Sequence, residues 1–178
     1  KNQLNPHMLF NSLNTLRSLV REDQDKAQEY IQELSRVLRY TLQGNDSKSV
    51  TLRDEMEFVS AYIFLLKMRF EDNLSFDIRI DKQYDDHRLP PMAVQMLIEN
   101  AVKHNEISDR RPLSIRVYTE GEELVVTNPV QPKLTATAGT GVGLANLAKR
   151  YHLLYKCEIQ ITENKYFTVR IPLIPNAL

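Results

Sequence analysis

The chain has 178 residues, of which 42% are hydrophobic and 26% charged, a composition typical of one globular domain or two small ones. Its 23 basic residues balance 23 acidic ones, so it lacks the positive excess of proteins that track phosphate backbones, and we expect no nucleic-acid partner. The single cysteine, Cys157, excludes an internal disulfide, and the four histidines lack the thiol partners of a zinc site. A reducing, cytosolic setting fits this composition.

The longest uninterrupted apolar stretch, residues 61–66, is far shorter than the roughly 20 residues that cross a bilayer. We therefore expect no membrane contact by this chain. It opens at Lys1 with neither an initiator methionine nor a signal-peptide pattern, which favours a piece of a longer protein.

The first seventy or so residues have the apolar spacing of helices. The spacing predicts helices after Pro6, over 26–42 and over 56–70, with Thr51 and Asp54 forming a capping pattern before the third helix. In the first helix the apolar face is expected at Leu9, Leu13, Leu16 and Val20. Helices joined by such short connections favour an antiparallel hairpin that pairs with a second copy, a homodimer.

Beyond Asn73 the pattern changes to the alternation typical of strands. Strands are predicted at 76–80, 114–119, 123–128, 158–162 and 166–172, and helices at 92–104 and 142–155. The prediction is an α+β fold: a helical module, residues 1–72, followed by an α/β sandwich, residues 73–178, with an antiparallel sheet and helices on one face. The loop 129–138 is expected to be mobile.

Three of the five glycines, Gly139, Gly141 and Gly143, fall directly before the last predicted helix. Glycines let the backbone approach a ligand, and the N–H groups of a helix start bind anions, so a phosphate is the natural ligand. A flexible turn is the alternative. The spacing matches neither a Walker loop nor the dinucleotide fingerprint.

The helix after Pro91 carries a dense set of polar residues. Glu99 and Lys103, with Gln95, share one face by their spacing of four. The amide oxygen of Asn100 suits a hard cation that also contacts substrate phosphates, and Lys103 can meet phosphate charge directly. An ordinary solvated helix face is the alternative.

His7 lies at the start of the first predicted helix, on one face with Asn11, Asn14 and Ser18. A neutral imidazole on a rigid helix can act as a nucleophile. Most surface histidines have no such role, and His87 and His152 lack supporting partners.

Together these segments resemble the LytS/YehU-type sensor histidine kinases. Residues 5–14, Asn-Pro-His-Met-Leu-Phe-Asn-Ser-Leu-Asn, look like that family's phosphoacceptor box. Leu-Pro-Pro at 89–91 with Ile-Glu-Asn-Ala-Val-Lys-His at 98–104 look like its N-box. Residues 139–146, Gly-Thr-Gly-Val-Gly-Leu-Ala-Asn, look like its glycine box.

The resemblance implies a dimerisation and phosphoacceptor module followed by a Bergerat-type ATP-binding domain that uses ATP and Mg²⁺. His7 then maps onto the phosphoacceptor, with Asn11 facing the same reaction space and Glu99 a candidate base. Asn100 maps onto the magnesium ligand. The implied nucleotide contacts are Asn100, Lys103, His104, Asn128, Gly139, Gly141, Gly143, Leu144 and Asn146.

By the same resemblance the phosphoryl group passes to an aspartate in the receiver domain of a response regulator, often one with a LytTR-type DNA-binding domain. The chain would be the cytoplasmic portion of a sensor anchored in the inner membrane. One departure is Asn128, which stands where many Bergerat sites carry an adenine-reading aspartate, so its amide lacks the charge that strengthens such a bond. The alternatives are a non-catalytic nucleotide-sensing dimer and an ATPase without a phosphohistidine.

Overall fold

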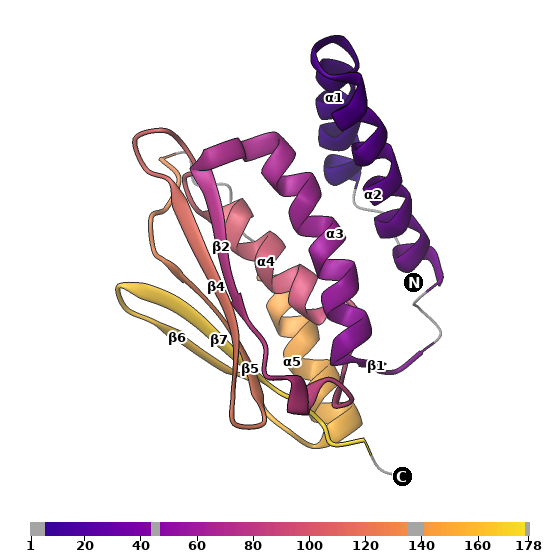
Figure 1. The fold of residues 1–178 in the computed structure, drawn as a ribbon. Helices are drawn as coiled ribbons and strands as arrows, with labels where there is room; N and C mark the ends of the chain where they lie inside the picture. Colours follow the sequence, from indigo (N-terminus) through magenta and orange to yellow (C-terminus); the bar gives the residue numbers. More distant parts are fainter. Residues whose placement is uncertain (1–5, 44–46, 135–140, 177–178) are drawn as a thin grey trace.

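A helical hairpin stands beside an α/β sandwich in the computed structural model, which describes residues 6–43, 47–134 and 141–176. Helices α1 (Pro6–Glu22) and α2 (Gln24–Gln43) form the hairpin, and α3 (Leu52–Phe70) lies between it and the rest of the molecule (Figure 1). A five-stranded sheet follows, with α3, α4 (Ala93–His104) and α5 (Val142–Tyr155) on one of its faces. The predicted order, a helical part and then an α/β sandwich, is confirmed.

The reversal between α1 and α2 is made by one residue, Asp23. Its N–H donates to Leu19 O (2.8 Å), which completes α1. Its side chain accepts from Lys26 N (3.1 Å), which caps the start of α2. The expected antiparallel hairpin is therefore closed by a single residue that serves both helices.

The face of α1 that contacts the rest of the chain differs from the predicted stripe. Ser12 is buried, and the apolar side chains that pack against the core are Met8, Leu16 and Leu19. Leu13 and Val20 of the predicted stripe are each 50% exposed. The predicted stripe therefore packs only in part against this chain, because α1 carries apolar residues on two faces and spacing alone does not say which face meets α2 and α3.

Helix α3 begins where the capping pattern predicts. Thr51 accepts a hydrogen bond from Asp54 N (3.2 Å). Just before it, β1 (Val50–Thr51) pairs antiparallel with β3 (Arg88–Leu89). The start of α3 is thus tied to a segment nearly forty residues further along the chain.

The main sheet has the strand order β2-β4-β5-β7-β6. Its strands are β2 (Leu74–Arg79), β4 (Leu113–Glu120), β5 (Glu123–Pro129), β6 (Gln160–Glu163) and β7 (Tyr166–Pro172). All neighbours are antiparallel except β2 and β4, which run parallel. The expected wholly antiparallel sheet is therefore corrected to a mixed one, because the chain crosses over through α4 between these two strands.

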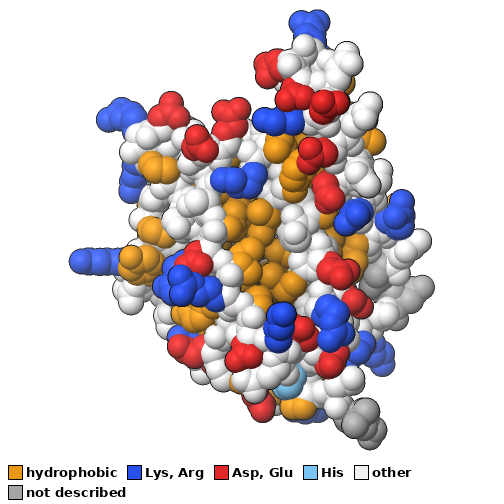
Figure 2. Space-filling model, in the orientation of Figure 1, with side chains coloured by type: hydrophobic (Ala, Val, Ile, Leu, Met, Phe, Trp, Pro, Cys, Tyr) orange, Lys and Arg blue, Asp and Glu red, His pale blue; other side chains and the backbone are white. Residues whose placement is uncertain are grey.

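Helix α3 shares its packing with both halves of the chain. It contacts α2 on one side and α4 and β2 on the other. Partly buried apolar side chains of α3 and β2, among them Met56, Ile63, Phe76 and Ile80, pack against the core. Figure 2 shows apolar side chains gathered over the space between these two elements. The division near residue 72 stays a prediction, and α3, which precedes it, packs into the core of the second half.

Candidate functional site

A cavity of about 590 Å³ lies between α1, α3 and α4. It brings His7 and Asn11 of α1 together with Glu99 and Lys103 of α4, which lie far away in the sequence. Its volume is in the range of small-molecule sites. The other residues that line it are Met8, Ser12, Thr15, Tyr30, Tyr62, Leu65, Leu66, Arg69, Phe70, Val102, Asn105, Ile107 and Lys133.

The cavity face of α4 carries the residues whose spacing predicts a shared stripe. Gln95 Nε2 donates to Glu99 Oε2 (2.8 Å), and Glu99 and Lys103 both line the cavity. The predicted common face of these three residues is confirmed. His7 and Asn11 face the same space, whereas Asn14 and Ser18 are exposed outside it.

The beginning of α5 packs on Met96 of α4. A Cβ added to Gly143 would lie 2.9 Å from Met96 Sδ, so glycine is what lets α5 pack this closely on α4. Asn100 follows Met96 by one helical turn, is half-buried, and is missing from the described lining of the cavity. Glu99 and Lys103 thus line the cavity beside α1, and Asn100 lies next to them on α4, near the contact with α5.

Gly141 takes the left-handed conformation just before α5, with φ +61°. Its carbonyl accepts from Ala145 N (3.0 Å), which starts the helix. Further along the predicted glycine box, Leu144 packs against the core and Asn146 is exposed. Gly139 lies outside the described residues. A left-handed glycine directly before a helix leaves the first N–H groups of that helix available to an anion.

Asn128 lies on the central strand β5 and is 2% exposed. Its Nδ2 donates to Pro129 O (2.7 Å), which fixes the orientation of the amide. The neighbouring Thr127 hydroxyl hydrogen-bonds to that of Thr168 on β7 (2.7 Å). Asn128 is therefore held within the sheet, with its amide oxygen as the group suited to accept a hydrogen bond.

His104 is half-buried in the last turn of α4. Burial lowers the pKa of its imidazole, and the charges of Lys103 and Lys133 lower this pKa further. His104 is therefore neutral at neutral pH, and three basic residues converge at this end of the helix.

The start of α4 is fixed by Glu55, a fully buried carboxylate on α3 that sequence analysis missed. Glu55 Oε1 accepts from Met92 N (2.9 Å) and from Tyr40 Oη on α2 (2.9 Å), and Oε2 accepts from Val94 N (3.1 Å). Burial raises the pKa of the Glu55 carboxyl above its ordinary value, and these three donors oppose the shift.

The junction at Glu55 links three helices. Because a carboxylate that accepts N–H groups at a helix start acts as its cap, Glu55 holds α4 in place from α3. Tyr40, whose ring stacks on Phe58 with centroids 4.2 Å apart, joins α2 to the same point. One signal for Glu55 exists in the sequence: it lies at helical spacing from Leu52 and Tyr62, on the face that α3 buries.

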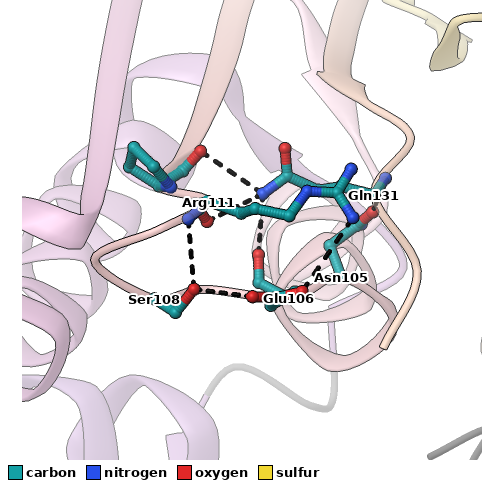
Figure 3. Close-up of polar contacts among 6 residues, drawn as sticks. Asn105, Glu106, Ser108, Arg111 and Gln131 are labelled. Atoms are coloured by element: carbon teal, nitrogen blue, oxygen red, sulfur yellow. Dashed lines mark hydrogen bonds and ion pairs between the residues drawn. The ribbon is translucent and has the colours of Figure 1, made fainter. Parts of the chain in front are cut away.

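Gln131 ties the segment after β5 to the end of α4, as Figure 3 shows. Gln131 N donates to Asn105 Oδ1 (2.9 Å), and its Nε2 donates to the carbonyls of Glu106 (2.8 Å) and Arg111 (3.0 Å). Gln131 is buried, and Val130 N donates to Lys165 O (3.0 Å). Residues 130 and 131 of the loop expected to be mobile are thus fixed by hydrogen bonds, and residues 135–138 lie outside the description.

Among the described residues, no cluster of three or more His, Cys, Asp or Glu could hold a metal ion. The amide of Asn100 is still compatible with Mg²⁺, because this cation keeps several waters and takes most of its protein-side ligands from one or two residues and substrate phosphates. None of the described helices is long and apolar enough to cross a membrane.

Comparison with known proteins supports the kinase resemblance. Residues 1–74 match the family model described as "Histidine kinase". The chain is 34% identical over 171 residues to the sensor protein LytS of Streptococcus agalactiae, covering 86% of the chain and 29% of that protein. It is 33% identical over 181 residues to the sensor histidine kinase BtsS of Escherichia coli K12, covering 96% of the chain and 32% of that protein.

The chain belongs to the LytS-type sensor histidine kinases. It spans about a third of the length of these curated relatives. The cytoplasmic segment of histidine kinase QseC has a similar fold, with a TM-score of 0.52 and 12% identity, covering 85% of this chain and 95% of that one. At such low identity this last likeness concerns the fold alone.

Proposed function

We propose that this chain is the catalytic core of a two-component sensor kinase, which binds Mg-ATP and transfers its γ-phosphoryl group to His7. The observation that supports this most is the cavity that joins His7 and Asn11 of α1 to Glu99 and Lys103 of α4. In this proposal residues 1–72 supply the acceptor and residues 73–178 the nucleotide site. Helix α3, which contacts both, connects them.

The nucleotide would occupy the region where α4 meets α5 and β5. The close approach of Gly143 to Met96 and the left-handed Gly141 support a phosphate at the start of α5, and Leu144 and Asn146 follow in the same helix. Lys103 and His104, in the last turn of α4, are proposed to contact the phosphates, and the buried Asn128 is proposed to accept from the adenine. Gly139 completes the proposed set, and Asn100 would hold Mg²⁺, which neutralises phosphate charge when bound.

His7 acts as the nucleophile in this proposal. A ring nitrogen of the neutral imidazole forms a bond to the γ-phosphorus while the bond to the β–γ bridging oxygen breaks, and the electron pair leaves with ADP. Glu99 can accept the proton of the other ring nitrogen, which stabilises the positive charge that develops on the ring. Lys103 stabilises the phosphoryl oxygens, and Asn11 helps to orient the group from the next turn of α1.

The outer face of the hairpin supports a homodimer. Phe10 and Leu13 of α1 are 65% and 50% exposed, and Ile31 and Leu42 of α2 are 48% and 59% exposed. Two such faces would bury each other in a bundle of four helices. From phospho-His7 the group would pass to an aspartate of a response-regulator receiver domain, and the family resemblance of the sequence implies that this regulator often carries a LytTR-type domain.

A second candidate, a dimer that senses nucleotide without transferring phosphate, is favoured by one observation. Asn128 replaces the charged adenine-reading residue, and its amide is already engaged with Pro129 O. A neutral acceptor forms the weaker hydrogen bond, so nucleotide would bind less tightly.

Incubation with Mg²⁺ and γ-labelled ATP distinguishes these functions. We expect an alkali-stable, acid-labile label on the protein that is lost in His7→Gln and kept in His152→Gln, a matched change at an exposed histidine of α5. Nucleotide binding without label would contradict the kinase and support the sensor. Release of free phosphate without label would support an ATPase instead.

A further inference from the structure

Three cationic side chains line the cavity beside His7: Arg69 from the last turn of α3, Lys103 from α4, and Lys133 from the segment after β5. Glu99 is the one carboxylate among the described lining residues. The formal charge of this lining is therefore positive. Arg69 and Lys133 stand out because neither belongs to a motif that the sequence resemblance covers.

Arg69 is available to a ligand. Within residues 6–43, 47–134 and 141–176, no ion pair involves Arg69, Lys103 or Lys133. The Arg69 guanidinium lies over the ring of Phe70, 4.5 Å from its centroid. Arg69 as a whole is exposed, yet desolvation lowers the pKa of its guanidinium below the ordinary value, and no described carboxylate pairs with it, an arrangement that favours an anionic ligand.

The polar floor of the cavity has partners within the protein. Burial raises the pKa of the Tyr30 hydroxyl, which Ser12 and Thr15 of α1 oppose, and burial likewise raises the pKa of the Tyr62 hydroxyl, which Gln95 of α4 opposes. Both tyrosines are buried. The tyrosines form a neutral part of the cavity wall, and the cationic side chains supply the charge that suits an anionic ligand.

Lys133 is brought to the cavity by the Gln131 contacts. Gln131 joins its own segment to Asn105 and Glu106 through three hydrogen bonds between 2.8 and 2.9 Å, one of them from Glu106 N to Gln131 O. Lys133 follows two residues later and lowers the pKa of His104, which places its charge near the end of α4. The positions of all three cations thus depend on structured segments.

We propose that Arg69, with Lys103 and Lys133, forms a phosphoryl-binding site in this cavity that holds the phosphoryl group at His7. The ligand class is a phosphate monoanion or dianion attached to a larger group. A planar guanidinium can contact two phosphoryl oxygens at once, and the two ammonium groups add charge from α4 and from the segment after β5. Arg69 would then contact the transferred group without touching the remainder of the nucleotide.

The inference rests on the proposed phosphorylation of His7, yet its test does not require ATP. Phosphoramidate transfers its phosphoryl group to an imidazole nitrogen as its own P–N bond breaks and ammonia leaves. The chain is phosphorylated in this way, and the ³¹P resonance of phospho-His7 is identified as the one absent from His7→Gln. Its titration midpoint is then measured in the wild type, in Arg69→Gln, and in Arg79→Gln, an exposed arginine of β2 paired with Asp77.

We expect the midpoint in the wild type to lie about 0.5 to 1 pH unit below that in Arg69→Gln, because a nearby cation favours the more ionised phosphoryl group. Arg79→Gln should match the wild type, and Arg69→Lys should recover part of the shift. The other titratable groups that line the cavity with His7 are Tyr30, Tyr62, Glu99, Lys103 and Lys133, and they are present in all of these variants. Lys133→Gln is expected to raise the midpoint by a smaller amount.

A second measurement identifies the source of the phosphoryl group. In the His7→Gln background, Arg69→Gln should weaken the binding of ATP about tenfold relative to the binding of ADP, if the cavity also holds the γ-phosphate before transfer. If the ratio of ATP affinity to ADP affinity is unchanged while the titration midpoint of phospho-His7 changes, the site binds the phosphoryl group of phospho-His7 alone. Equal midpoints in wild type, Arg69→Gln and urea-unfolded protein, together with an unchanged ratio, would overturn the proposal. A chain that binds no nucleotide but shows the midpoint shift would contradict the proposed kinase and leave the site standing.

Discussion

The two ends of α4 differ in how their polar and charged groups find partners. At its beginning, the buried carboxylate of Glu55 accepts from two backbone N–H groups and from Tyr40, so the polar groups there are satisfied within the protein. Toward its other end, Lys103 lies beside a cavity with no ion-pair partner among the described residues. The difference indicates that the first end maintains the fold and the second is built for a ligand.

The largest expected effect separates activity from stability at the ligand end. Lys103→Ala should lower the rate of His7 phosphorylation by about 10³-fold, because one charged donor to a transferring phosphoryl group contributes about 4 kcal/mol. The free energy of unfolding should change by less than about 0.5 kcal/mol, since Lys103 is exposed. Initial rates with labelled ATP and urea unfolding measure the two quantities. Lys149→Ala on α5 is the matched control, and a large loss of stability in Lys103→Ala would break the comparison.

At the other end, Glu55→Ala should have its main effect on stability. Three donors lose their acceptor in a buried place, which costs about 3 kcal/mol in the free energy of unfolding. Urea unfolding followed by circular dichroism measures this. Glu57→Ala, an exposed position of the same helix, serves as the control. A loss below about 1 kcal/mol would show that Glu55 is not the cap of α4.

A smaller effect is expected where α4 meets α5. Gly143→Val should lower the free energy of unfolding by about 1 to 2 kcal/mol. It should also weaken the binding of Mg-ATP about tenfold, because the valine side chain would push α5 away from Met96. Gly143→Ala should lie between the wild type and Gly143→Val, since Met96 is flexible and can yield. Calorimetric titration with Mg-ATP gives the affinity. An unchanged affinity in Gly143→Val would mean that the contact between α4 and α5 does not shape the nucleotide site.

The smallest effect is a pH dependence at Glu55. The pKa of Glu55 in the folded state is raised above 4.5. The contribution of this raised pKa to the free energy of unfolding is therefore fully present below pH 4.5 and is lost as pH rises through the folded-state pKa. Glu55→Gln does not titrate, so its stability relative to the wild type should improve as pH rises from 4.5 upward. Urea midpoints of both proteins across this range test the sign. A relative stability that falls with pH would contradict it.

Local features of the fold could be predicted from the sequence, and contacts between distant segments could not. Thr51 and Asp54 predicted the start of α3 because a cap depends on four neighbouring residues. The shared face of Gln95, Glu99 and Lys103 followed from helical spacing. By contrast, the parallel pairing of β2 with β4 depends on the path of the chain between them, which no local pattern specifies.

The candidate site divides in the same way. His7, Glu99 and Lys103 were identified from motifs, and the cavity joins them. Arg69 and Gln131 were missed because an arginine at a helix end and a glutamine in a loop have ordinary surface roles in most sequences. Their positions beside the cavity and beneath the segment of Lys133 emerge only when α3, α4 and β5 are packed together.

Direct mapping of the phosphorylated residue tests the central claim, that His7 receives the γ-phosphoryl group of ATP. The chain, or the longer protein that contains it, is incubated with Mg-ATP and digested at neutral to alkaline pH, and the peptides are sequenced by mass spectrometry. The account predicts one phosphoryl group on His7, absent with ADP. Phosphorylation on His87, His104 or His152 instead, or an unmodified His7 in a protein shown to bind Mg-ATP, would contradict it.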